Sequence, residues 1–284
     1  MDEKDLTGLD SHFSFGKNWE SYARAITEDE IDCATQSLSR LLGRDSIAGL
    51  TFLDIGSGSG VHSLAALRLG AKHVTAVDID PDSISTTTDT LRRYWPGGNY
   101  TVIQSSVFDI PAVHNERYDV VYSWGVLHHT GDMHRAIQCA TEMVASGGEF
   151  VFALYRRVLM DGFWALEKRW YAAASPAAQS VARKLYVLMF RAGLFLTGRS
   201  YQRYISGYKS TRGMDFGHDV HDWLGGWPYE SISPGEIRAV MAAAGLDCIR
   251  EFIRPGRFFG RHLGFFGSGC DEYVYRRSGP GGRA

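Results

Sequence analysis

Short apolar runs alternate with longer stretches of helical periodicity through the first half of the chain. Five of these runs have the length and composition of buried strands: residues 50–56, 73–79, 100–106, 118–125 and 149–155. Helical patterns lie between them at 61–69, 81–94 and 132–145, and SGG at 146–148 marks the expected end of the last helix. Strands and helices in this order predict an α/β fold, with a parallel sheet covered by helices on both faces.

The alternation breaks after residue 155. Residues 156–212 are mostly helical in pattern, and their basic side chains far outnumber the two carboxylates, Asp161 and Glu167. The α/β pattern returns with a helix at 234–244 and strands near 248–254 and 270–276. We therefore expect four segments: an N-terminal helical lid (1–45), the ligand-binding core (46–155), a helical cap insertion with a substrate loop (156–230) and the C-terminal completion of the core sheet (231–284).

The composition is that of an ordinary globular protein. Of the 284 residues, 44% are apolar and 22% charged, and the formal net charge of -2 gives no general attraction to nucleic acid or anionic membranes. The four cysteines stand far apart without a CxxC pair, so neither a zinc site nor a disulfide framework is expected. The N-terminal stretch MDEKDLTGLD lacks the apolar run of a secretory signal, and we expect the protein in the cytoplasm.

Three glycines follow the first expected strand, in FLDIGSGSG. Gly56, Gly58 and Gly60 remove side chains at the carboxyl end of a strand, where open α/β sheets bind ligands, so the main chain can approach a ligand closely. A dinucleotide fingerprint needs GxGxxG, but here the third glycine arrives one residue early. Asp54, inside the strand end, would repel a pyrophosphate and attract a cation. The spacing therefore indicates a ligand that carries positive charge near this loop.

The second expected strand ends in VDID and places Asp78 at its tip. A carboxylate there can accept hydrogen bonds from both hydroxyls of an adenosine ribose. Adenosine with a cationic tail describes S-adenosylmethionine, whose ammonium group would face Asp54. The combination of LDIGSGSG, AVDIDP and YDVVYSWGVLHHTGDM resembles the class I S-adenosylmethionine-dependent methyltransferases, and within that family it is most similar to the small-molecule and quinone-type enzymes. The resemblance implies a Rossmann-like, mostly parallel seven-stranded sheet whose last strand is antiparallel.

The resemblance also implies where the cofactor is held. The glycine loop would lie on its methionine side, the tip of the second strand on its ribose and adenine, and the end of the third strand on its adenine. The end of the fourth strand would border the sulfonium. The residues concerned are Asp54, Gly56, Ser57, Gly58, Gly60, Asp78, Ile79, Ser106, Val107, Trp124 and Gly125.

Two adjacent histidines, His128 and His129, follow the fourth strand, near where an acceptor would meet the methyl group. A neutral imidazole there could take the proton from an attacking hydroxyl or amine, which makes both candidates for the catalytic base. The alternative is that the pair supports the turn before Asp132, which is placed to cap the next helix. Proximity alone accelerates many methyl transfers, so a base is not obligatory.

Candidate acceptor-binding residues are aromatic or acidic. Phe15, Trp19 and Tyr22 recur near helical spacing and would either pack on the core or close over the cofactor as a lid. The loop at 212–230 mixes carboxylates with tryptophans and could bind a cationic acceptor, or could be a solvated loop anchored by its aromatic residues. Its HxxH spacing comes without a wider ligand set, so no metal is expected. The candidates are Phe15, Trp19, Tyr22, Tyr155, His218, Asp219 and Asp222.

The basic cap contains the apolar run LYVLMF, which is too short to span a bilayer. Core packing or a subunit contact, as in a homodimer formed through the cap, competes here with contact to an anionic surface or to RNA. No RNA-binding module accompanies the charge, so nucleic acid is disfavoured.

Taken together, these patterns predict methyl transfer from S-adenosylmethionine to an oxygen or nitrogen, and less readily a carbon, of a small metabolite. A non-catalytic partner protein with the same fold and an RNA-directed methyltransferase are the alternatives, and the glycine spacing argues against a nicotinamide oxidoreductase.

Overall fold

A seven-stranded sheet with the order β3-β2-β1-β4-β5-β7-β6 runs through the centre of the molecule. The computed structural model describes residues 26–113, 116–208, 216–256, 263–267 and 269–279. The strands are β1 (Thr51–Ile55), β2 (His73–Asp78), β3 (Tyr100–Gln104), β4 (Tyr118–Trp124), β5 (Val144–Tyr155), β6 (Leu246–Phe252) and β7 (Cys270–Arg277). All neighbours pair in parallel except those of β7, which is antiparallel to both β5 and β6. The predicted sheet and its antiparallel last strand are confirmed.

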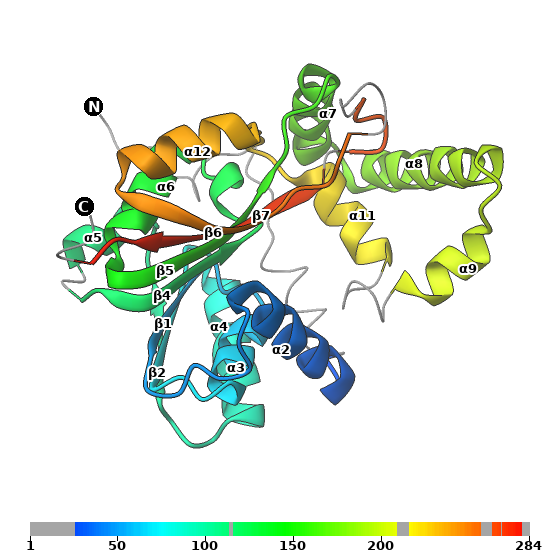
Figure 1. Cartoon of the computed structure of the whole chain (residues 1–284). Helices are drawn as coiled ribbons and strands as arrows, with labels where there is room; N and C mark the ends of the chain where they lie inside the picture. The colour runs from blue at the N-terminus through cyan, green and yellow to red at the C-terminus, as the bar shows by residue number, and fades with distance from the viewer. Residues whose placement is uncertain (1–25, 114–115, 209–215, 257–262, 268, 280–284) are drawn as a thin grey trace.

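Helices cover both faces of the sheet, as Figure 1 shows. One layer contains α2 (Glu28–Leu42), α3 (Val61–Arg68) and α4 (Pro81–Tyr94), and the other contains α5 (Ile110–Val113), α6 (Met133–Glu142) and α12 (Pro234–Ala243). Apolar side chains from each layer form a separate core with one face of the sheet. Asp132 caps α6 by accepting a hydrogen bond from the Arg135 N–H at 3.1 Å, as the sequence predicted.

One expected boundary was wrong. The helix expected to end at 145 ends at Glu142, and β5 begins at Val144, so the SGG stretch lies inside the strand. Gly147 has a φ of +78°, and a Cβ on Gly148 would meet the Tyr118 carbonyl oxygen at 2.9 Å. The two glycines therefore let β5 run close beside β4 at the register shift near Tyr118, rather than end a helix.

The described part of the expected N-terminal lid is α2, and it belongs to the core. Ile31, Leu38 and Leu42 are buried against α3 and the sheet, and the helix ends at Gly43 in the left-handed conformation. Phe15, Trp19 and Tyr22 lie outside the described residues. Closure of a lid over the cofactor stays a prediction.

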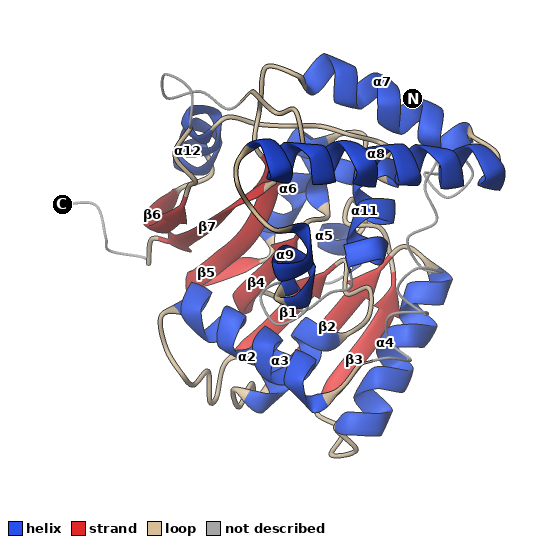
Figure 2. Cartoon of the chain, turned by 90° about the vertical axis from the view of Figure 1, so that its right-hand side faces the viewer, coloured by secondary structure: helices blue, strands red, loops and turns tan. Residues whose placement is uncertain are grey.

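The cap forms a separate layer beyond the carboxyl ends of the parallel strands. It contains α7 (Asp161–Ala173), α8 (Pro176–Leu196), α9 (Tyr201–Ser206) and α11 (Phe216–Gly225), which Figure 2 shows above and in front of the strand ends. Trp164, Tyr171, Val220 and Leu224 form the centre of its own small core. Within the described residues, no helix combines the length and the apolar character needed to cross a bilayer.

Candidate active site

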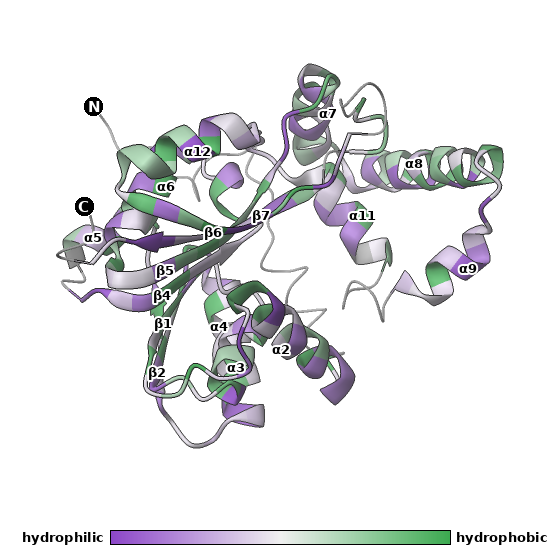
Figure 3. Ribbon diagram, viewed as in Figure 1, coloured by the Kyte–Doolittle hydropathy of each residue, from purple (hydrophilic) through white to green (hydrophobic). Residues whose placement is uncertain are grey.

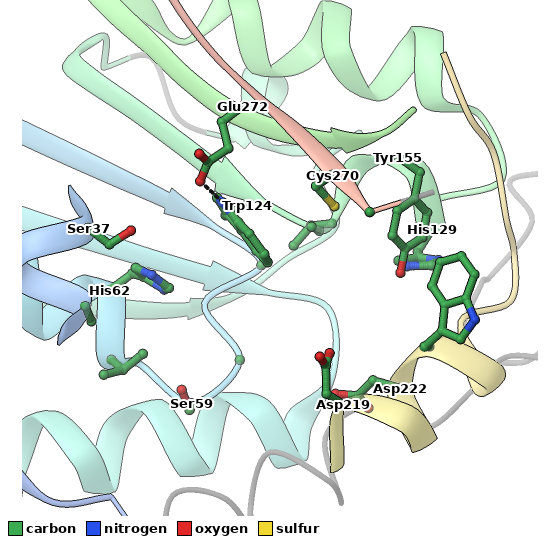
Figure 4. Close-up of a pocket in the computed structure, with 18 of the residues that line it drawn as sticks. Ser37, Ser59, His62, Trp124, His129, Tyr155, Asp219, Asp222, Cys270 and Glu272 are labelled. Atoms are coloured by element: carbon green, nitrogen blue, oxygen red, sulfur yellow. Dashed lines mark hydrogen bonds between the residues drawn. The ribbon is translucent and has the colours of Figure 1, made fainter. Parts of the chain in front are cut away.

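A cleft of about 1680 Å³ separates the carboxyl ends of the strands from the cap. Single-ligand pockets usually measure roughly 300–1,000 Å³, so this cleft has room for two ligands side by side. Figure 4 shows that its walls come from parts of the chain far apart in the sequence, including α2, the ends of β4 and β5, the start of β7, and α11. A two-substrate reaction fits a space of this shape.

The glycine loop adopts a conformation that other residues would strain. Gly56, Gly58 and Gly60 all have φ between +52° and +78°, in the left-handed region. A Cβ on Gly56 would stand 2.6 Å from Val126 Cγ1, and one on Gly60 would stand 3.0 Å from Thr87 Cα. The Gly56 N–H donates to the Val77 carbonyl at 2.7 Å, which ties the loop to β2. The glycines therefore let the loop pack closely on Val126 and Thr87, and Gly56 and Gly58 leave main chain without a side chain at the cleft wall.

Asp78 at the tip of β2 lines the cleft and organises this loop. Its Oδ2 accepts from the Gly58 N–H and its Oδ1 from the Asp80 N–H, both at 3.0 Å. Burial raises the pKa of this carboxyl to about 6 despite these bonds, which act to lower it. A carboxylate can accept about four hydrogen bonds, so Asp78 retains capacity for ribose hydroxyls. Neighbouring predicted residues that also line the cleft are Ser57, Ile79, Ser106 and Val107.

Asp54 lies deeper than the sequence suggested. It is buried, its Oδ2 accepts from the Ser63 hydroxyl at 2.6 Å, and it is not among the residues that line the cleft; neither is Gly60. Burial raises the pKa of Asp54 to about 7. Through its hydrogen bond with Ser63, Asp54 connects the end of β1 to the first turn of α3. Direct contact between Asp54 and a cationic ligand stays a prediction.

Sequence reasoning missed Glu272, at the start of β7. The Trp124 indole N–H donates to Glu272 Oε1 at 3.0 Å, and Arg40 of α2 pairs with Oε2 at 2.7 Å. Figure 4 shows the Trp124 and Glu272 side chains meeting at the cleft wall, with His62 close by. Burial lowers the pKa of His62 to about 4, so this imidazole is neutral. Trp124 is therefore held in place at the point where the resemblance expects the sulfonium, and Gly125 lines the cleft beside it.

The two histidines have different surroundings. His128 is fully buried, its ring lies 3.9 Å from that of Tyr155, and its Nδ1 accepts from the Tyr155 N–H at 3.4 Å. Burial holds the pKa of His128 well below its usual value. His129 lines the cleft, and its Nδ1 lies 2.7 Å from the Pro228 carbonyl oxygen. Since a carbonyl only accepts, Nδ1 donates, and this bond fixes the orientation of the ring. His128 is therefore buried behind the cleft wall, whereas His129 is part of that wall.

The cap end of the cleft is aromatic, with two carboxylates. Tyr155, Asp219 and Asp222 all line it, and Asp219 accepts a hydrogen bond from the Tyr208 hydroxyl. The side chain of His218 lies outside the described part of the structure. Trp223, one of the tryptophans expected at this wall, lines it too. Further wall residues that sequence reasoning did not name are Tyr186, Phe190, Tyr204, Phe216 and Phe266. Among the described residues, no group of three or more His, Cys, Asp or Glu side chains could hold a metal ion.

Comparisons with known proteins agree with this geometry. The model of the methyltransferase domain family matches residues 26–251. Relatives include a ubiquinone biosynthesis O-methyltransferase from Methylobacterium sp. (strain 4-46), 32% identical over 118 residues, or 42% of this chain and 46% of that one. A ribosomal protein L11 methyltransferase from Geotalea uraniireducens (strain Rf4) is 40% identical over 72 residues, or 25% of this chain and 22% of that one. These alignments span less than half the length of either relative.

A solved structure shares the fold across most of both chains. It is a magnesium protoporphyrin IX methyltransferase from Synechocystis PCC 6803 with bound SAH, at a TM-score of 0.52 and 15% identity, covering 88% of this chain and 84% of that one. The family model spans the glycine loop, Asp78 and the end of β4 in one continuous match. The chain therefore belongs to the methyltransferase domain family and has the class I fold.

Proposed function

We propose that this protein uses S-adenosylmethionine to methylate an oxygen or nitrogen of a small, apolar and aromatic acceptor. The observation that carries the proposal is that one cleft joins two chemically different ends. The end at β1 and β2 presents bare main chain and the Asp78 carboxylate, whereas the end at the cap is lined by aromatic rings. An acceptor of this kind is in line with the small-molecule and quinone-type branch that the sequence resembles.

The cofactor end fits S-adenosylmethionine, which when bound supplies a methyl group on a positively charged sulfur. Asp78 offers its remaining acceptor capacity to the ribose hydroxyls, and Ile79, Ser106 and Val107 offer the surface for adenine. A Cβ at Gly56 would leave no room for Val126, so the bare loop is a built feature of this end. Trp124 and Gly125 stand where the two ends of the cleft meet.

The acceptor end is a box of aromatic side chains. The Phe190 ring lies 5.2 Å from that of Tyr204 and 5.6 Å from that of Phe216, and the Tyr155 ring lies 5.3 Å from that of Trp223. Such walls favour a flat apolar molecule by burial and ring contacts. Asp219 and Asp222 stand on the same side of the cleft and would favour an acceptor with a hydroxyl or amine group.

We propose that His129 takes a proton from the acceptor. Its Nδ1–H donates to the Pro228 carbonyl and orients the ring at the cleft wall, and Nε2 would take the proton as the acceptor oxygen or nitrogen bonds to the methyl carbon. Burial holds the pKa of Tyr155 well above its usual value, so its phenol stays neutral and can donate a hydrogen bond. Base and donor thus come from the two strand ends nearest the cap.

Thermal melting with S-adenosylhomocysteine and with NAD tests the cofactor assignment. A ligand at about a hundred times its dissociation constant adds roughly 2.7 kcal/mol of stability, so S-adenosylhomocysteine should raise the melting temperature and NAD should not. A shift with NAD alone would overturn the proposal.

Transfer of a labelled methyl group to a panel of phenols, aromatic amines and total RNA tests the acceptor class. We expect label in the small aromatic compounds. Label in RNA alone would favour the RNA-directed alternative, and tight S-adenosylhomocysteine binding without transfer to any acceptor would favour the non-catalytic one.

A further inference from the structure

The outer face of α8 is apolar and faces solvent. Val181, Leu185, Leu188 and Phe195 recur at helical spacing, so they form one stripe along the helix. Leu188 is 61% and Phe195 82% exposed. Figure 3 shows hydrophobic residues over much of α8, broken by hydrophilic bands. Helices at a protein surface normally turn charged residues toward the solvent, whereas α8 turns apolar residues toward it.

A second stripe lies on the neighbouring helix α7. Phe163, Leu166 and Trp170 are all more than half exposed and occupy positions i, i+3 and i+7. The opposite side of α7 buries Trp164 and Tyr171 in the cap core, to which α8 adds Tyr186 and Val187 and α11 adds Val220 and Leu224. Both helices therefore pack inward on α11 and turn apolar stripes outward. Monomeric proteins rarely leave apolar surface this extensive without a binding purpose.

The charges along α8 and α9 are of one sign, whereas α7 contains Asp161 and Glu167. From residue 176 to 206 the chain contains Arg183, Lys184, Arg191, Arg199 and Arg203 and no Asp or Glu. Lys184 and Arg191 lie one helical turn on either side of Leu188, at the edge of the stripe. A second copy of the chain would bring cations against cations, with no carboxylate from this segment to separate them. An occupant that is apolar and negatively charged satisfies both features.

We propose that the outer face of the cap, formed by the exposed stripes of α7 and α8 with Lys184 and Arg191, docks on the surface of an anionic phospholipid bilayer. Helices that bury an apolar face among the acyl chains and hold Lys and Arg at the headgroups bind membranes in this way, parallel to the surface. Each basic side chain near such a surface strengthens binding, and both Lys184 and Arg191 are exposed here. The proposal does not depend on methyl transfer, and it places the acceptor end of the cleft, lined by Tyr186 and Phe190 on the inner side of α8, next to the lipid.

Vesicle sedimentation of the full chain tests the proposal. We expect the protein to sediment with vesicles of phosphatidylcholine mixed with phosphatidylglycerol, to bind vesicles of phosphatidylcholine alone far less, and to bind less as salt rises. The double variant L188Q/F195Q removes apolar surface without changing charge, and K184E/R191E reverses two charges. Each should lower partition into anionic vesicles by at least about tenfold.

A matched control separates the cap from general electrostatics. K72E/R92E makes the same charge change at exposed positions outside the cap and should bind anionic vesicles as the natural chain does. All variants should unfold cooperatively in thermal melting without ligand, which shows that they are folded and keeps this test apart from that of the proposed function. Three results would overturn the proposal: no sedimentation of the natural chain with anionic vesicles, equal loss in the control variant, or a dimer in light scattering that L188Q/F195Q dissociates while vesicles stay unbound.

Discussion

The carboxylate of Asp78 accepts a hydrogen bond from the main-chain N–H of Gly58, with 3.0 Å between Oδ2 and the nitrogen. One side chain thus connects the tip of β2 to the glycine loop that follows β1. Asp78 therefore holds the loop conformation and is also the residue expected to contact the ribose. A variant of Asp78 should be tested both for stability and for cofactor affinity.

Replacement of Asp78 by alanine should weaken S-adenosylhomocysteine binding by about ten- to a hundredfold. The variant loses charge-assisted hydrogen bonds worth about 1.5–3 kcal/mol and leaves the Gly58 and Asp80 N–H groups without their acceptor. Titration calorimetry measures the affinity. Asp89→Ala, which removes an exposed carboxylate from α4, is the control. Equal affinity in the two variants would place the ribose elsewhere.

Replacement of Asp54 by asparagine should stabilise the ligand-free protein more at pH 8 than at pH 5. Burial raises the pKa of Asp54 from 3.8 to about 7, so between these values the folded state binds more protons than the unfolded state. The free energy of unfolding therefore falls as pH rises through this window, by up to about 1.4 kcal/mol for each unit of pKa difference. Asparagine carries no such penalty, and the Ser63 hydroxyl can still pair with it.

Urea unfolding at the two pH values measures this difference. The natural chain should lose more stability between pH 5 and pH 8 than the Asp54→Asn variant does. A variant that changed stability by the same amount at both pH values would show that Asp54 titrates normally.

Gly56→Ala should cost both stability and cofactor affinity. The left-handed φ of +78° strains any L-residue by about 1–2 kcal/mol, and the new methyl group would also collide with Val126. Gly98→Ala is a matched control, since Gly98 has a φ of +79° and open space around it. We expect the Gly56 variant to lose about 1–3 kcal/mol more than the control, as overpacking does. Only the Gly56 variant should bind S-adenosylhomocysteine more weakly, which calorimetry would show.

His129→Ala should lower the single-turnover rate by about a hundredfold while cofactor affinity stays nearly unchanged, because we propose that His129 takes the acceptor proton. His128→Ala should show the opposite pattern, with a lower melting temperature and a smaller loss of rate, because its buried ring packs on Tyr155. Near-normal rates in both variants would mean that proximity and orientation alone carry the reaction.

The features that the sequence predicted well are those encoded locally. The strand and helix order, the glycine loop and the position of Asp78 each depend on neighbours within a few residues, so periodicity and turn chemistry were sufficient. Glu272 could not be found this way, because its contact with Trp124 joins residues 148 positions apart. That contact depends on the register of β7 against β5, which a run of apolar residues does not specify.

The aromatic wall of the acceptor end had a signal that the sequence reasoning did not use. Tyr186 and Phe190 are four residues apart and so share one face of α8, while Leu185 and Leu188 lie on the other. The run LYVLMF was treated as a unit, although a helix divides it between an inner and an outer surface. Separation of the two faces would have indicated an aromatic inner side from the sequence.

The direction of β7 has a consequence for how this chain can change during evolution. Because β7 is antiparallel, its first residues, Cys270 and Glu272, pair with Tyr155 and Ala153 where β5 ends, and so reach the cleft. The described residues at the cofactor end come from the first 125 positions together with Glu272, whereas those around the acceptor come mainly from positions after 128. We therefore expect insertions in the cap or before Cys270 to alter which molecule is methylated without disturbing the donor. Recombination near the end of β5 would exchange the specificity for the acceptor and keep the specificity for the methyl donor.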